Sequence, residues 1–79
     1  MILSDHAREE MLKDGISEED VRQCLEHGRV IIENCVNGEM RYGEKLAMKD
    51  RSVIAIYTFR LGEPRVITAY TVNDQRWRK

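Results

Sequence analysis

The sequence predicts an α+β domain in which two N-terminal helices pack on one face of a four-stranded antiparallel sheet, an ααββββ order. Two early segments have apolar residues at helical spacing and a capping residue before each. Two pairs of strand-like segments follow, and a short turn separates the members of each pair. The 79 residues are enough for one small core. We therefore expect a single domain over residues 1–79, with a short basic tail over about residues 73–79.

The first helix is expected to begin at Ser4 or Asp5 and to run to about Lys13. Serine and aspartate are good N-caps because their side-chain oxygens accept hydrogen bonds from the free amides of the first turn. Gly15 follows the helix, and glycine adopts the left-handed conformation of a C-cap without steric cost.

A second helix is predicted from Ser17 to about His27. Ser17 is its N-cap, and the three acidic residues at positions 18–20 lie at the positive end of the helix dipole. The positions i, i+3 and i+4 form an apolar stripe. The stripe consists of Val21, Cys24 and Leu25.

The first hairpin is predicted from strands at residues 29–36 and about 39–48, joined by Asn37-Gly38. Both turn residues tolerate a positive φ, which a two-residue hairpin loop requires. Neither face of this hairpin alternates cleanly between apolar and polar residues, so the pattern assigns no buried side. A two-residue loop pairs Asn34 with Arg41 and Glu33 with Tyr42.

The second hairpin consists of the apolar, β-branched segments 52–59 and 65–72. With a four-residue loop over residues 61–64, the small aliphatic face is expected against the helices and the other face is expected to be open. We expect any site on that second face. The first face then contains Ile54, Ile56, Thr58, Ile67, Ala69 and Thr71. The second contains Val53, Ala55, Tyr57, Phe59, Val66, Thr68, Tyr70 and Val72.

Composition indicates a soluble globular protein, for which the cytoplasm is the expected compartment. No apolar run approaches the roughly 20 residues of a membrane helix, and the start shows no secretory signal. Without a signal, Cys24 and Cys35 are expected to be buried thiols rather than a disulfide. We expect no cofactor and no membrane partner.

Charge is divided unevenly along the chain. Residues 1–40 contain four Lys/Arg and ten Asp/Glu, whereas residues 41–79 contain nine and four, for a net charge of −1. A basic second half can bind phosphate or an acidic partner. The alternative is that the two halves attract each other.

Four residues are candidates for chemistry in the folded part of the chain. His6 in the first turn of a helix is biased towards the neutral imidazole, which can act as a base or a metal ligand, or it can simply cap its own helix. Arg41 is a phosphate-binding candidate, or else an exposed neighbour of Asn34. Tyr57 and Tyr70 can stack on a base, although sheet packing explains them equally well. Arg41 and Tyr42 are adjacent on a strand and therefore point to opposite faces.

The C-terminal tail interleaves Trp77 with Arg76, Arg78 and Lys79. RNA-binding tails have this composition, and so do frayed termini. The chain contains no phosphate-binding loop, nucleophile elbow, zinc spacing or paired-carboxylate motif. We expect no metal site. A site made of His6 and a carboxylate is the minor alternative.

A resemblance to a known family extends over nearly the whole chain. It rests on His6-Ala7, Met11, Gly15-Ile16-Ser17, Asp20-Val21, Leu25, Gly28, the Gly38-x-x-Arg41-Tyr42 step and Val66-Ile67-Thr68-Ala69-Tyr70. The pattern resembles domain-of-unknown-function family 4258, which in turn is similar to the BrnT-type ribonuclease toxins of the RelE/ParE superfamily. The resemblance implies a RelE-like fold, RNA cleavage by side chains on the sheet, and a cognate antitoxin as partner. It also implies His6, Arg41, Tyr42 and Tyr70 as the catalytic positions.

Two functional hypotheses follow. The first is a toxin-like, metal-independent endoribonuclease, in which Arg41 stabilises charge on the phosphate, a histidine or tyrosine moves the 2′-OH proton, and Tyr57, Arg76 and Arg78 help to bind RNA. The second is a non-catalytic interaction domain, either a homodimer or the partner of a neighbouring gene product. The near-neutral charge and the lack of a defined catalytic motif favour the second hypothesis.

Overall fold

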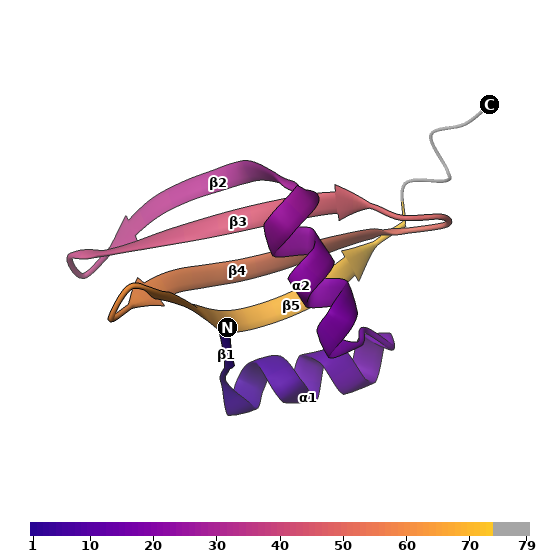
Figure 1. Ribbon diagram of the computed structural model, residues 1–79, viewed down its shortest axis with the longest axis horizontal. Helices are drawn as coiled ribbons and strands as arrows, with labels where there is room; N and C mark the ends of the chain where they lie inside the picture. The colour runs from indigo at the N-terminus through magenta and orange to yellow at the C-terminus, as the bar shows by residue number, and fades with distance from the viewer. Residues whose placement is uncertain (74–79) are drawn as a thin grey trace.

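The computed structural model describes residues 1–73, which form two helices and one five-stranded sheet (Figure 1). The strand order is β1-β5-β4-β3-β2. The α+β class and the position of both helices before the main strands are confirmed. The elements are β1 (Ile2–Leu3), α1 (Asp5–Asp14), α2 (Glu18–His27), β2 (Arg29–Val36), β3 (Glu39–Ala47), β4 (Ser52–Arg60) and β5 (Glu63–Val72).

The sheet is mixed and has one strand more than predicted. β1 pairs in parallel with Arg65 and Val66 of β5, whereas the other neighbouring strands are antiparallel. The Met1 ammonium nitrogen lies 2.7 Å from a Glu63 carboxylate oxygen and fixes the start of the chain against β5. The expectation of four antiparallel strands is therefore wrong, because a two-residue strand is too short to show any alternation in the sequence.

Both helices form where their caps indicate. Ser4 Oγ accepts a hydrogen bond from the Ala7 amide at 3.0 Å, and Gly15 ends α1 with φ of +65°. Ser17 and Asp20 form a reciprocal capping box at the start of α2, with both N···O distances at 3.0 Å. These caps involve only residues close in sequence, so local patterns predict them well.

The first hairpin also forms as predicted. Asn37 and Gly38 have φ values of +52° and +79°, as a two-residue turn of this type requires. The observed register pairs Asn34 with Arg41 and Glu33 with Tyr42.

The core lies between the helices and the β4 face of Val53, Ala55 and Tyr57, which was predicted to be open. Ile54 and Ile56 lie on the uncovered face, which we term the open face, and Tyr57 is buried on the helix side. Figure 1 shows both helices on one side of the sheet. The sheet contributes Val53, Ala55, Tyr57, Val66 and Ala69 to this core.

The second hairpin also departs from the predicted register. Its loop has two residues, Leu61 and Gly62, with φ of +54° and +77°, instead of four residues. This shorter loop moves the pairing next to the turn by two residues, which leaves each side chain on its predicted face, whereas Ala55 pairs with Ala69, one residue away from the predicted register. Since side chains alternate with period two, a slip of one residue moves a whole set to the other face.

A bulge in β5 changes the register within the same hairpin. Ile56 pairs with Thr68 and Tyr57 pairs with Val66, so Ile67 is the extra residue. Ser4 Oγ donates to the Ile67 carbonyl at 3.0 Å, which ties the start of α1 to the bulge. The bulge therefore lets β5 place alanine against the helices at one end and arginine on the open face at the other.

Both cysteines are free thiols, as expected. Cys24 is buried, whereas Cys35 is exposed on β2, so the expectation that both are buried is wrong for Cys35.

Candidate functional site

The structure separates the four residues predicted to be catalytic. His6 is exposed in the first turn of α1. Arg41 and Tyr70 lie on the open face, whereas Tyr42 lies on the helix side with its ring stacked on Tyr57, the centroids 5.6 Å apart. Only Arg41 and Tyr70 of the four therefore share a face of the sheet.

Tyr57 is not available for stacking on the open face, contrary to expectation. Its exposed fraction is 8%, and its hydroxyl donates to Glu44 Oε1 at 2.8 Å. Burial, together with this hydrogen bond, raises the pKa of the Tyr57 phenol. The predicted RNA contacts Arg76 and Arg78 lie outside the described residues.

Three arginines surround a cavity of about 190 Å³ on the open face, near the two hairpin turns. Arg41 comes from β3, Arg60 from β4 and Arg65 from β5. We term this cavity the arginine pocket. Its other lining residues are Ser4, Glu39, Thr58 and Ile67.

Strand pairing explains why the arginines converge. Thr58 pairs with Arg65 across β4 and β5, and its hydroxyl donates to the Met40 carbonyl of β3 at 2.7 Å. Arg41 directly follows Met40 on β3. Thr58 thus stands between an arginine on each neighbouring strand, and paired positions of an antiparallel sheet point to the same face.

The pocket has an excess of positive charge. A Glu39 carboxylate oxygen lies 3.4 Å from Arg41 Nη2, and the other lies 3.6 Å from Arg60 Nε. One carboxylate therefore faces three guanidinium groups. Arg41 Nε is buried and has no hydrogen-bond partner among the described residues. A buried donor without a partner is costly.

The chemistry of the pocket suits a phosphate group. Arginine keeps its charge at all physiological pH values, and its planar fork matches two oxygens of a phosphate or carboxylate. The Thr58 and Ser4 side chains add hydroxyl oxygens to the lining. The arrangement can therefore bind an oxyanion and stabilise negative charge that develops on it.

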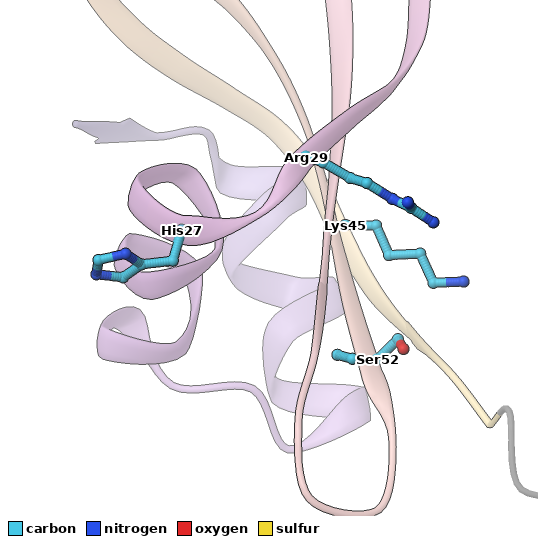
Figure 2. A pocket seen from close by; sticks show the side chains of 5 residues that line it. His27, Arg29, Lys45 and Ser52 are labelled. Carbon is cyan, nitrogen blue, oxygen red and sulfur yellow. The ribbon is translucent and has the colours of Figure 1, made fainter.

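A second basic cluster lies at the other end of the open face. A cavity of about 370 Å³ is lined by His27, Arg29, Lys45, Ala47 and Ser52. Figure 2 shows the side chains of Arg29, Lys45 and Ser52 pointing to one side of the sheet and His27 pointing to the other. Arg29 and Lys45 are paired across β2 and β3.

The middle of the open face is apolar. A Cβ atom on Gly43 would lie 2.9 Å from Ile32 Cδ1 and 3.0 Å from Ile56 Cδ1, so the two isoleucine side chains close over the glycine. Tyr70 is paired with Ile54 on the same face. Along the strands, the open face is therefore basic at the end with the arginine pocket, apolar in the middle, and basic again at the other end.

Sequence reasoning identified Arg41 and missed the rest of the arginine pocket. The predicted register put Arg65 on the same face as Ala69 and therefore against the helices. A two-residue loop at Leu61-Gly62 would have placed Arg60 opposite Glu63 and Thr58 opposite Arg65, as observed. The glycine at the second loop position was the available signal.

Residues 3–71 match the model of the domain of unknown function DUF4258. The chain belongs to this family. It matches no curated protein and no solved structure. Within residues 1–73, neither helix is long and apolar enough to cross a membrane. The same residues include no group of three or more His, Cys, Asp or Glu side chains placed to hold a metal ion.

Proposed function

We propose that this DUF4258 protein is a toxin-like, metal-independent endoribonuclease that binds RNA on the open face of its sheet. The arginine pocket is the observation that supports the proposal, since it places three guanidinium groups around a cavity of about 190 Å³. The two basic ends of the open face fit a phosphodiester backbone that runs along the strands. The resemblance to RelE/ParE toxins, with a RelE-like fold, belongs to the same proposal.

In the proposed reaction, the arginine pocket holds the scissile phosphate. The RNA 2′-oxygen attacks phosphorus while its proton passes to a base, and the bond to the 5′-oxygen breaks. The products are a 2′,3′-cyclic phosphate and a 5′-hydroxyl whose proton comes from water. Arg41 stabilises the charge on the phosphoryl oxygens. His6 is the proposed base because the family resemblance implies it, and it is exposed in the first turn of α1, whose N-cap Ser4 lines the pocket. Tyr70 contacts a neighbouring nucleotide.

A cleavage assay with a single-stranded RNA tests this proposal. The wild type is expected to cut the RNA in the presence of EDTA and to leave 2′,3′-cyclic ends. Arg41→Ala should reduce the rate by about 100-fold or more, in line with the loss of one donor to a charged transition state. Arg22→Ala removes the same charge from an exposed position on α2 and should retain full activity. Absence of cleavage by the wild type, or equal rates for wild type and Arg41→Ala, refutes the proposal.

A second candidate function is a protein-interaction domain, which the exposed edge of the sheet favours. β2 pairs only with β3 among the described strands, and seven of its eight residues are exposed. Val30, Ile31 and Ile32 have exposed fractions of 45%, 43% and 38%. An edge strand with free backbone groups and apolar side chains can pair with a strand of another chain. The partner would be a cognate antitoxin or a second copy of this chain.

Light scattering and capture from lysate test this candidate. A dimer, or a captured partner that is lost in Ile31→Lys but retained in Leu12→Lys, would support it. Leu12 is the matched control because its side chain is exposed on α1. A strict monomer without a captured partner argues against this function.

A further inference from the structure

The two hairpins lose their ladder pairing near their turns, where the Thr58 hydroxyl of β4 still donates to the Met40 carbonyl of β3. Pairing between β3 and β4 runs from Ala47 and Ser52 to Tyr42 and Tyr57 and stops there. Each strand continues beyond that point, to Glu39 in β3 and to Arg60 in β4. Figure 1 shows the β2–β3 turn and the β4–β5 turn apart at the same end of the sheet, where the helices do not reach.

A second cavity lies at this end, and its walls are aromatic. It has a volume of about 290 Å³, and Met40, Tyr42 and Phe59 line it together with Gly38, Glu39 and Thr58. We term it the aromatic pocket. The Phe59 ring makes edge-to-face contacts with Tyr42 and Tyr57, with centroids 6.0 and 5.7 Å apart. Phe59 nevertheless has an exposed fraction of 53%, so much of the ring is accessible.

The aromatic pocket adjoins the arginine pocket. Glu39 and Thr58 line both cavities. Arg41 and Tyr42 point to opposite faces of β3, yet each lines one of these two neighbouring cavities. The end of the sheet where the hairpins separate therefore places accessible rings beside a cluster of guanidinium groups.

We infer that the aromatic and arginine pockets together bind one unpaired nucleotide, with the base on Phe59 and Tyr42 and the phosphate between Arg41 and Arg65. Every base has a π-face that can stack on an aromatic ring, and the phosphate requires the arginine fork. Together the two cavities fall within the roughly 300–1,000 Å³ range of small-ligand sites. A base inside a duplex is already stacked and cannot enter, so the substrate class is single-stranded RNA.

This inference rests on the proposed function for the identity of RNA as the natural ligand, and a smaller probe tests it separately. Calorimetric titration would compare adenosine 5′-monophosphate, adenosine and inorganic phosphate. The nucleotide is expected to bind at least tenfold more tightly than either fragment. A protein that binds phosphate as tightly as the nucleotide would overturn the inference.

Two substitutions test the contributions of the two pockets separately. Phe59→Ala should weaken binding of the nucleotide about 5- to 150-fold, the range for the loss of one stacking contact, and should leave phosphate binding unchanged. Arg65→Ala should weaken both. The matched controls are Leu12→Ala, an exposed apolar residue on α1, and Arg22→Ala, an exposed arginine on α2. Both controls should bind the nucleotide as the wild type does, and equal affinity of Phe59→Ala and wild type would overturn the inference.

The outcomes for the nucleotide site and for catalysis are distinct. Nucleotide binding that depends on Phe59 and Arg65, in a protein that does not cut RNA, supports the inference and refutes the ribonuclease. Cleavage of RNA that depends on Arg41, but is indifferent to Phe59→Ala, supports the ribonuclease and refutes the base pocket.

Discussion

The Cys24 thiol is expected to make the protein lose stability at alkaline pH. Cys24 is fully buried, and its Sγ lies 3.2 Å from the Glu44 carbonyl oxygen and 3.4 Å from the Val53 carbonyl oxygen, with the thiol as donor. Burial, with a further contribution from the negative charge of Glu44, raises the pKa of the Cys24 thiol from 9.0 to about 11. The folded state therefore favours the neutral thiol.

The sign and size of the effect follow from linkage. Below pH 9 the thiol is neutral in both states, so its contribution to stability is fully present. As pH rises above 9, the unfolded chain releases the proton first, and stability falls until pH passes about 11. At pH 10 the unfolded thiol is mostly ionised and the folded thiol mostly neutral. The difference is about tenfold in the unfolding equilibrium, or roughly 1 to 2 kcal/mol.

Urea unfolding at pH 7 and pH 10 measures this difference. Between the two pH values, the free energy of unfolding should fall by roughly 1 to 2 kcal/mol more in the wild type than in Cys24→Ala, because the variant lacks the titrating group. Cys35→Ala is the matched control, and it should behave as the wild type because Cys35 is exposed. Equal losses for wild type and Cys24→Ala would refute the reasoning, as would rapid labelling of Cys24 by a thiol reagent in the folded protein at pH 8.

Three further outcomes follow from the structure. Gly28→Ala should reduce the free energy of unfolding by at least about 2 kcal/mol in urea titrations, because its Cβ would lie 2.5 Å from the Cys24 carbonyl oxygen and 2.7 Å from that of Lys45. Tyr57→Phe should reduce it by about 1–3 kcal/mol at neutral pH, because the buried Glu44 carboxylate loses its donor, whereas an unchanged midpoint would contradict this. If the three guanidinium groups of the arginine pocket contact three phosphates, anisotropy titrations with single-stranded RNA should give a slope near −2 in log affinity against log salt. Each arginine-to-alanine change there should reduce the slope by about 0.7, and a slope near zero would argue against phosphate contacts.

The parts of the fold that could be predicted from the sequence are those that depend on neighbours in the chain. Ser4, Ser17 and Gly15 indicate the helix ends, and Asn37-Gly38 sets the register of the first hairpin. Each works through hydrogen bonds or φ angles within a few residues. The second hairpin was harder, because leucine at the first loop position is unusual at positive φ and the Leu61-Gly62 turn was therefore read as part of a longer loop.

The bulge at Ile67 was not predictable from local pattern. A tertiary contact interrupts the alternation of β5 side chains at this point, since Ser4 at the start of α1 donates hydrogen bonds to the Val66 and Ile67 carbonyls. The pairing of β1 with β5 depends on the same part of the chain. Residues more than 60 positions apart therefore decide which β5 side chains face the helices, and strand periodicity contains no information about them.

The candidate site was predictable only where it depends on the first hairpin. Arg41 was identified because the Asn37-Gly38 turn fixes its position. Arg60 and Arg65 were missed because the face that they share with Thr58 was expected against the helices, and Phe59 because its exposure depends on where the helices end. The proposed stacking residue changes accordingly from Tyr57, which is buried, to Phe59.

The turn at Leu61-Gly62 and the bulge at Ile67 together give β5 two different roles. With the short turn alone, Thr58 would pair with Arg65 as observed, but Ala69 would also lie on the open face. If the register that pairs Ala55 with Ala69 continued as far as the turn, Ala69 would stay in the core, but Arg65 would no longer pair with Thr58. The extra residue resolves this conflict, because it lets β5 pack Ala69 against the helices and present Arg65 to the arginine pocket. A bulge costs ladder hydrogen bonds, so its presence between the core and the arginine pocket is consistent with a function at the turn end of the open face.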